Sequence, residues 1–562
     1  MADWGKNMCS HISFAIVIVA FSVCVTLSSV FASENQTLVA KTVISKESAS
    51  KQAVSKHAKL VGIDVIQNRL GNLTPTGRGV TMGHVESGGA NGGQYIPNIH
   101  NHRYTGVRFE LMSKSSKVSG HADATARLIY GKQGLAPGVT DVQLYEANDW
   151  LTDRGLNVQR VLNRARTLWS PPKAPMSQGR RVLSHSWIHT SSAVRDAIAI
   201  RRLDHLIDRD HVIVVAGVNN GGATPVPHLL ASSYNTIAVG TVGKKSSSGY
   251  TRIEGAGRCK PDVVVAMSKT SFSTPVAAAV VARLVETADG IVMRAVAASR
   301  DKAGSTKKGN SVGKENAGSS VKRNGKIVVG AISKSPGLHA NKAQVIKAVL
   351  MAGADKSCGF APQEGRPLDQ HHGAGAVRFD RSYDILAGGW VLHDKIRQAG
   401  QALPVAAPAA LKQKNGWSFA GIGVNELQAY SLQIDSPAKE LCIAIVWHRV
   451  VKGNIVDHPK DENRRVWRTA VRLPDLNLGL IRLKTAAGKG AVATTKLAKT
   501  GGTGKSEVSD KLGLVGKSMS KADNVEHVYL KDVSPGLYQI VVRRVDRGSR
   551  DDTPYALAWW QR

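Results

Sequence analysis

Residues 260–284, KPDVVVAMSKTSFSTPVAAAVVARL, contain a short apolar run, a turn rich in Ser and Thr, and a long Ala/Val-rich segment. The apolar run is typical of a buried strand. The long segment is typical of a helix that Pro275 would help to start. Ser271 lies at the turn between the two. The stretch therefore predicts a strand–turn–helix unit with a serine immediately before the helix.

The same alternation continues outward from this unit, from about residue 59 to about residue 386. Its apolar runs include GVTMGHV, VQLYEA, RVLSHSW, HVIVVAGV and NTIAVGTVG. Short buried runs separated by amphipathic stretches favour an α/β domain with a mostly parallel sheet and helices on both faces. We place this domain at residues 59–392. A Lys/Gly/Ser-rich insertion at about 300–325 cannot bury a core, and we predict that it is disordered.

A different pattern begins beyond about residue 410. The runs AYSLQI, ELCIAIVW, LNLGLIRL, HVYLKDV, GLYQIVV and PYALAWW are short, strand-like and separated by turn residues. They predict an antiparallel β-sandwich or jelly roll over residues 410–562. A second basic insertion, at about 484–521, interrupts it.

The N-terminus has the features of an export signal. Residues 12–31 form one apolar run, and Val30 and Ala32 stand at the −3 and −1 positions of a cleavage site. We predict a signal peptide at 1–32 and a polar leader at 33–58; an uncleaved membrane anchor is the alternative. No second long apolar run follows, so no transmembrane domain is expected after cleavage. The expected location is outside the cell, in the periplasm or at the cell surface.

The composition indicates which classes of partner the protein could bind. The chain has 562 residues, with 75 Lys+Arg against 42 Asp+Glu and a net charge of +33. Such a charge favours contact with anionic polymers at a cell surface, and the two basic insertions are the candidate contacts. They lack interleaved aromatic residues, so no specific nucleic-acid site is predicted. The cysteines beyond the signal, Cys259, Cys358 and Cys442, allow at most one disulfide and form no CxxC pair, which excludes a disulfide scaffold and a cysteine zinc site.

Four polar residues occur where predicted strands end or helices begin, which is where α/β folds place their sites. Glu86 follows GVTMGHV, and His121 opens the helical stretch GHADATARLIYG. Asn219 follows HVIVVAGV, and Ser271 precedes the Ala/Val-rich segment. A serine hydroxyl is a weak nucleophile that needs a base, and a carboxylate orients a histidine for that task. The set therefore favours nucleophilic catalysis by serine.

In this order and with these surroundings, the segments resemble the subtilisin-like serine proteases (subtilases, peptidase family S8). GRGVTMGHVESGG resembles the strand of the family's catalytic acid, and GHADATARLIYGKQGLAPGV resembles its histidine helix. VLSHSWIH, VIVVAGVNNGG, GRCKPDVVVAMSKTSFSTPVAAAVVARL and HHGAGAVRFDRSYDIL resemble the substrate strand, the oxyanion strand, the nucleophile helix and the closing segment. The C-terminal strands resemble the jelly-roll or pre-peptidase-type domains of secreted subtilases.

The resemblance implies a role for each residue. The implied triad is Glu86, His121 and Ser271. Asn219 would donate to the oxyanion, because Asn-x-Gly then falls in register, and Ser186 and Gly217 would contact substrate. No cofactor and no metal are predicted, although acidic residues such as Asp475 and Glu526 are of the type that binds calcium.

Three departures from the family pattern affect this assignment. The family's acid is Asp, whereas Glu86 is one methylene longer. Lys269 replaces the Gly before Thr-Ser, and Val218 replaces the Gly before Asn219, where it is expected to narrow the specificity pocket. Should another acid orient His121, Asp123 and Asp141 are the next candidates.

The expected function is a secreted serine endopeptidase that acts on proteins or peptides. Two alternatives stay open. The first is an inactive subtilase-fold protein that binds peptides or anionic surface polymer. The second is a basic adhesion protein whose sandwich domain does the binding.

Overall fold

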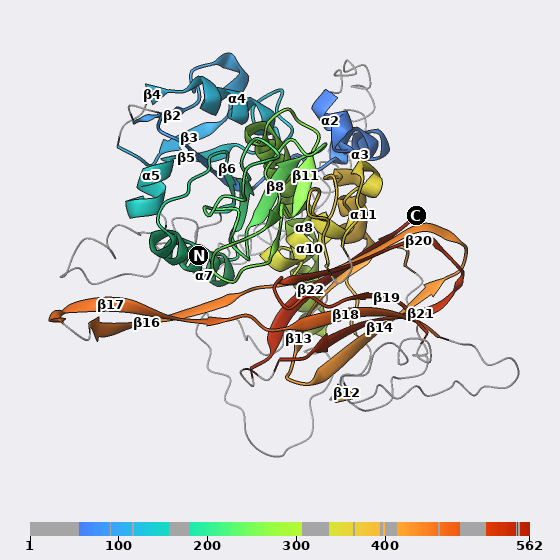
Figure 1. Cartoon of the computed structure of the whole chain (residues 1–562). Helices are drawn as coiled ribbons and strands as arrows, with labels where there is room; N and C mark the ends of the chain where they lie inside the picture. The colour runs from blue at the N-terminus through green and yellow to red at the C-terminus, as the bar shows by residue number, and fades with distance from the viewer. Residues whose placement is uncertain are drawn as a thin grey trace, which may run out of the picture. The chain divides into compact units, whose positions relative to one another are not determined.

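The computed structural model describes most of the chain beyond residue 55 (Figure 1). The described residues are 56–89, 92–114, 117–154, 156, 180–305, 337–363, 366–393, 397–398, 413–458, 461–483, 513–546, 548 and 551–562. The predicted signal peptide (1–32) and nearly all of the predicted leader lie outside them. Among the described residues, no helix has both the length and the apolar character needed to cross a membrane.

The first domain is built on a sheet of seven parallel strands in the order β11-β8-β7-β6-β1-β5-β3. The strands are β1 (Thr81–Glu86), β3 (Arg108–Leu111), β5 (Asp141–Glu146), β6 (Arg180–His185), β7 (Ile213–Gly217), β8 (Ile237–Thr241) and β11 (Val263–Val265). Strand β1 lies inside the sheet, between β6 and β5. Since all strands run the same way, the residues that end them share one edge of the sheet. The predicted parallel α/β fold is confirmed.

Helices and short strands surround this sheet. The helices are α2 (Lys56–Leu60), α3 (Ile63–Leu70), α4 (Gly120–Ile129), α5 (Ala147–Asp149), α7 (Ala193–Asp210), α8 (Thr270–Ser305), α10 (Ala343–Ala352) and α11 (Phe379–Gly388). Two small sheets pair β2 (Gln94–Ile96) with β4 (Lys117–Val118) and β9 (Gly249–Tyr250) with β10 (Cys259–Lys260). Helix α8 packs along β6, β7, β8 and β11, so it is the main helical layer on the sheet.

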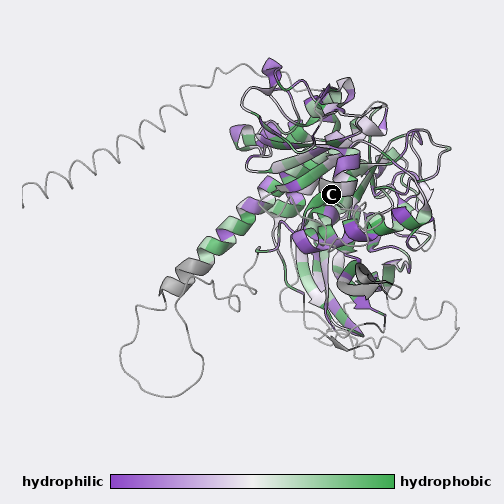
Figure 2. Cartoon of the chain, turned by 90° about the vertical axis from the view of Figure 1, so that its left-hand side faces the viewer, coloured by the Kyte–Doolittle hydropathy of each residue, from purple (hydrophilic) through white to green (hydrophobic). Residues whose placement is uncertain are grey.

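Helix α8 begins earlier than the sequence predicted. Its first residue is Thr270, which places Ser271 in the first turn and Pro275 inside the helix. Pro275 has no backbone N–H to donate, so the carbonyl of Ser271 lacks its usual partner four residues on. The helix continues to Ser305, and its second half extends out from the domain (Figure 2). Met293, in this half, is 73% exposed. The predicted insertion at 300–325 thus begins within a helix, and residues 306–325 lie outside the described ones.

The C-terminal domain consists of two antiparallel sheets, as predicted. One has the order β12-β14-β21-β18-β19 and the other β13-β22-β15-β20. The strands are β12 (Arg397–Gln398), β13 (Gly416–Ile422), β14 (Glu426–Ile434), β15 (Ala438–Trp447), β18 (Leu476–Arg482), β19 (Leu514–Ser518), β20 (Val525–Val533), β21 (Gly536–Arg544) and β22 (Thr553–Gln561). One apolar cluster, including Trp447, Leu478, Ile540 and Trp559, draws side chains from both sheets. Strand β19 falls inside the predicted insertion at 484–521, whereas 484–512 lie outside the described residues.

A two-stranded hairpin extends from the sandwich (Figure 1). It pairs β16 (Val450–His458) with β17 (Asp461–Arg472). The start of the hairpin packs on the α/β domain, where His205 of α7 bonds the carbonyl of Val451 at 2.6 Å. Its strands were not among those predicted from the sequence.

The two domains are joined by a buried ion pair beside this hairpin. Arg449, 2% exposed at its side chain, donates from Nε to the Asp204 carboxylate of α7 at 2.6 Å and from a terminal nitrogen to Glu254 at 2.8 Å. Asp204 also accepts from the Ser233 hydroxyl and from the backbone N–H of Asn235. Every described oxygen of Asp204 therefore has a partner, and one partner comes from the other domain.

Replacing Arg449 should destabilise the whole folded chain. Arg449→Met leaves Asp204 buried without its cation, which costs about 3–5 kcal/mol in comparable buried pairs. Denaturant unfolding measures the effect, and the midpoint should fall. Lys452→Ala is the control, because the Lys452–Asp551 pair is exposed and should contribute less than about 1 kcal/mol. Equal midpoints for parent and Arg449→Met would contradict this account of the interface.

Candidate active site

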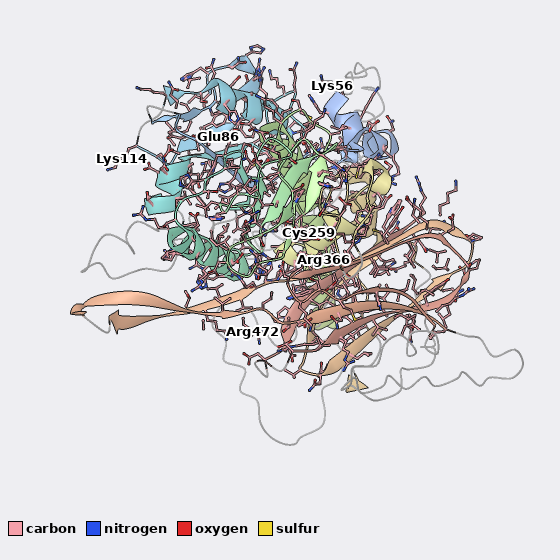
Figure 3. The ribbon with its side chains drawn as sticks, viewed as in Figure 1. Lys56, Glu86, Lys114, Cys259, Arg366 and Arg472 are labelled. Carbon is pink, nitrogen blue, oxygen red and sulfur yellow. The ribbon has the colours of Figure 1, made fainter. Side chains whose placement is uncertain are left out.

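Glu86 is the last residue of β1 and lies within the α/β domain (Figure 3). Its carboxylate is almost fully buried, yet both oxygens are hydrogen-bonded. Oε2 lies 2.8 Å from Nδ1 of His121, and Oε1 lies 2.9 Å from Nε2 of His84. The Thr125 hydroxyl donates to Oε1 at 2.7 Å. The predicted proximity of Glu86 and His121 is therefore present in the structure.

His121 is held by the first turn of α4. Ser119 caps this helix by accepting from the backbone N–H of Ala122. The cap fixes the start of the helix, so His121 follows directly and reaches back to the end of β1. The His121 side chain is 44% exposed, while its partner Glu86 is buried. With Nδ1 bonded to Glu86, only Nε2 remains for a substrate or a nucleophile.

The Glu86–His121 contact sets the charge of both groups. Burial raises the pKa of Glu86, but the hydrogen bonds from His121 and His84 outweigh it and bring the pKa from 4.5 to about 2. The same bond raises the pKa of His121 above 6.5, against the opposing effects of burial and of the Lys269 charge. Glu86 is therefore a carboxylate at neutral pH despite its burial.

Ser271 lies in the first turn of α8, close to the ends of two strands. Gly217, the last residue of β7, faces this turn: an added Cβ there would lie 2.8 Å from the Thr274 hydroxyl. The close approach explains a glycine at 217 by packing on α8. The charge of Lys269, two residues before Ser271, lowers the pKa of His121.

The contacts described for Ser271 do not include a hydrogen bond to His121. Catalytic hydrogen bonds of this kind are often long in free enzymes and tighten in the substrate complex. Of the three triad candidates, the structure thus joins Glu86 to His121 directly and brings the Ser271 turn to the same edge of the sheet.

Two adjacent asparagines lie beyond β7, and they point to different partners. Asn219 is tied through its backbone: its N–H donates to the Ser247 hydroxyl at 2.9 Å. The side chain of Asn220 reaches the nucleophile helix instead. Its Oδ1 accepts from the backbone N–H of Thr270 at 2.9 Å and from the Thr270 hydroxyl at 3.0 Å. Asn220 is thus the asparagine whose side chain contacts the Ser271 turn, and the oxyanion role of Asn219 stays a prediction.

The remaining predicted substrate contacts are buried. Ser186 follows β6, and its hydroxyl is buried without a hydrogen-bond partner among the described atoms. Val218 packs in an apolar cluster with Val226, Ala231 and Ala238. It therefore fills the domain interior and does not line an open pocket, which differs from the expected narrowing of a specificity pocket.

The two alternative acids are occupied elsewhere. Asp123 accepts from the Tyr104 hydroxyl at 3.0 Å and from the backbone N–H of Asn98 at 3.2 Å. Asp141 starts β5, at the opposite end of the strand from the site, and pairs with Arg108. Neither has a described contact with His121, so Glu86 is the acid that the geometry selects.

The described residues contain no group of three or more His, Cys, Asp or Glu arranged to hold a metal ion. Glu526, one of the acids considered for calcium, accepts instead from the Ser518 hydroxyl and the backbone N–H of Ser520. The thiols of Cys259, Cys358 and Cys442 are free.

Sequence reasoning missed three side chains around Glu86: His84, Thr125 and Tyr130. Two of them, His84 and Thr125, had a usable signal. His84 is two residues before Glu86, so a strand puts both on one face, and Thr125 is one helical turn after His121. These spacings would have placed them next to the predicted acid and base.

Comparison with known proteins gives one family match. Residues 110–307 match the subtilase family (peptidase S8), a range that includes His121 and Ser271 and begins after Glu86. No curated protein matches the chain.

Several solved structures are similar to part of the chain. The self-cleaved protease domain of PatA has 15% identity and a TM-score of 0.32, covering 56% of this chain and 99% of that one. The prenylagaramide maturation protease PagA has 15% identity and a TM-score of 0.32, covering 57% and 98%. The PatG macrocyclase in complex with peptide has 13% identity and a TM-score of 0.32, covering 58% and 95%. By the family match, residues 110–307 of this chain are similar to the subtilase family of serine peptidases.

Proposed function

We propose that the chain is a secreted serine endopeptidase that hydrolyses peptide bonds with Ser271, His121 and Glu86. The observation that carries the proposal is the 2.8 Å contact between the His121 imidazole and the buried Glu86 carboxylate, beside the turn that holds Ser271. The predicted signal peptide at 1–32 supports export. The idea that the basic insertions bind anionic polymer stays a prediction, because most of their residues lie outside the described ones.

Each member of the proposed triad would carry one step. Ser271 Oγ attacks the scissile carbonyl while His121 Nε2 takes the hydroxyl proton. The same proton then goes to the leaving amine, and a water repeats the sequence to release the acid. Glu86 stays ionised, fixes the Nδ1–H tautomer of His121 and stabilises the imidazolium. A glutamate can do this here because β1 ends at the residue itself, so its longer side chain reaches His121.

Asn220 is the side chain best placed to bind the oxyanion. Its Oδ1 is held by two donors on Thr270, so the amide Nδ2 is directed away from them and is available to donate. The N-terminus of α8 adds its dipole at the same place. The tetrahedral intermediate of Ser271 would form between these donors.

A fluorophosphonate probe tests the nucleophile. The Ser271 oxygen should bond to phosphorus as fluoride leaves, so the parent protein is labelled and Ser271→Ala is not. Hydrolysis of a denatured protein substrate should be lost in the same variant. Ser273→Ala is the matched control, because the Ser273 side chain is buried and donates to the Val265 carbonyl. Labelling that survives in Ser271→Ala would reject the proposal, and absence of labelling in the parent would favour the inactive peptide-binding alternative.

Alanine substitution decides between the two asparagines. Asn220→Ala should lower kcat by about 10²–10³-fold with little change in KM, the range known for removing one oxyanion donor from subtilisin. Asn219→Ala should lower kcat far less, because the described contacts of Asn219 are made by its backbone. Steady-state kinetics on one peptide substrate measures both. A larger loss in Asn219→Ala would restore the sequence-based assignment.

The ionisation of Glu86 predicts how stability depends on pH. A folded pKa of about 2 against 4.5 gives stability that is present above pH 4.5 and lost as pH falls toward 2. At 1.36 kcal/mol per pKa unit, this is about 3 kcal/mol. Glu86→Gln lacks this contribution, so the difference in unfolding free energy between parent and variant should shrink from pH 5 to pH 2. Denaturant unfolding across that range measures it, and a constant difference would show that Glu86 is not held as a carboxylate.

A further inference from the structure

We propose that His84 is a positioning residue for the triad, which holds the Glu86 carboxylate through the oxygen that His121 does not use. The inference rests on the proposed function, because it assigns His84 a task only if Glu86 is the triad acid. His84 makes no described contact with Ser271 or His121, so it acts through Glu86.

His84 is buried and fully engaged at both ring nitrogens. Its side chain is 1% exposed. Nε2 lies 2.9 Å from Glu86 Oε1 and 3.0 Å from the Thr125 hydroxyl, and Nδ1 lies 2.6 Å from the Tyr130 hydroxyl. The result is a continuous chain of polar contacts from Tyr130 through His84 and Glu86 to His121. A histidine that served only to fill the core would need no such alignment with the acid.

The partner of Nδ1 sets the direction of these bonds. The described residues offer the Tyr130 hydroxyl no other polar partner than His84. A buried hydroxyl donates where an acceptor is available, so Tyr130 donates to Nδ1 and the His84 proton resides on Nε2. That proton then points at Glu86. Tyr130 thus selects the tautomer of His84, as Glu86 selects the tautomer of His121.

The glutamate makes such a support useful. Compared with aspartate, Glu86 has one more rotatable bond, so its carboxylate has more positions to lose when it is fixed. Three donors remove that freedom: His84, Thr125 and His121. Two of them act on Oε1 and the third on Oε2, which orients the plane of the carboxylate toward the imidazole. A displacement of about 1 Å in such a group can cost about 10²-fold in rate.

The surroundings of Glu86 provide few substitutes for His84. The pKa of Glu86 is lowered by His84, on its own strand, and by His121, on α4. In turn, the charge of Glu86 acts to raise the pKa of His185, on β6, and of Tyr130, directly after α4. Burial raises the pKa of Glu86, and the hydrogen bonds lower it. Without the donor from His84, fewer hydrogen bonds would oppose the effect of burial, so the pKa of Glu86 would rise. A less firmly charged Glu86 would in turn lower the pKa of His121 toward its ordinary value.

Two substitutions at His84 distinguish the effect of its hydrogen-bond donor from the effect of its packing. Gln carries a donor at the reach of Nε2, whereas Met fills similar space without one. We expect His84→Met to lower kcat by about 10²-fold with KM nearly unchanged. The acidic limb of kcat/KM should move to lower pH, and His84→Gln should recover most of the rate. Parental kcat and an unmoved limb in a folded His84→Met protein would overturn the inference.

A double-mutant cycle tests whether His84 acts through Glu86. In the Glu86→Gln background, His84→Met should cause little further loss of kcat, because the carboxylate that it positions is already absent. Full additivity of the two losses would overturn the inference. If Glu86→Gln alone keeps parental activity, the proposed triad fails instead. If Glu86→Gln is disabled and His84→Met is not, the triad stands and only the role of His84 fails.

Tyr130→Phe keeps the test decisive if His84→Met does not fold. It removes one hydroxyl and leaves the ring, so the packing changes little, but the tautomer of His84 is no longer fixed. We expect a smaller loss in kcat, of about tenfold, that disappears in the Glu86→Gln background. A loss that persists unchanged in that background would count against the chain of contacts.

Discussion

A carboxylate buried at the end of the central strand is the constraint on which the site depends. An isolated charge in the protein interior is strongly unfavourable, and such a group normally takes up a proton. Glu86 stays charged because two histidines and a threonine donate to its two oxygens. These donors come from β1 and α4, so the strand and the helix must keep their mutual position for the charge to persist. The stability of this corner of the fold and the basicity of His121 therefore have one physical origin.

The position of the first turn of α8 is the second constraint on the site, and close contacts with the end of β7 and the residues after it hold this turn in place. Gly217 lets β7 approach the helix closely, and Asn220 anchors the N-terminal N–H of Thr270. Because the strands are parallel, β1 and β7 end at the same edge of the sheet. Glu86 and the Ser271 turn thus lie at one edge of the sheet, although 185 positions of sequence separate the two residues (271 − 86 = 185).

The sequence predicted the parts of the molecule that depend on local pattern. The buried strands and the sandwich strands follow from apolar runs, and the pairing of Glu86 with His121 was implied by the resemblance to the subtilases. The choice of Asn219 over Asn220 rested on Asn-x-Gly, which both residues fit, and only the structure shows that the Asn220 side chain contacts Thr270. The start of α8 was misjudged at Pro275 because proline is tolerated in a first turn. The Arg449–Asp204 pair joins residues 245 positions apart, and no local pattern reveals such a contact.

The buried Arg449–Asp204 pair also affects how the chain tolerates proteolysis. Peptidases cleave segments that open transiently, and a domain that opens independently offers more such segments. Here, separating the sandwich from the α/β domain would break the contacts of Arg449 with Asp204 and Glu254, so the domains are expected to open together rather than singly. A catalytic fragment that ended before the sandwich would keep Asp204 without Arg449. If the chain hydrolyses proteins as proposed, domains that open together would offer it fewer cleavage sites within its own fold.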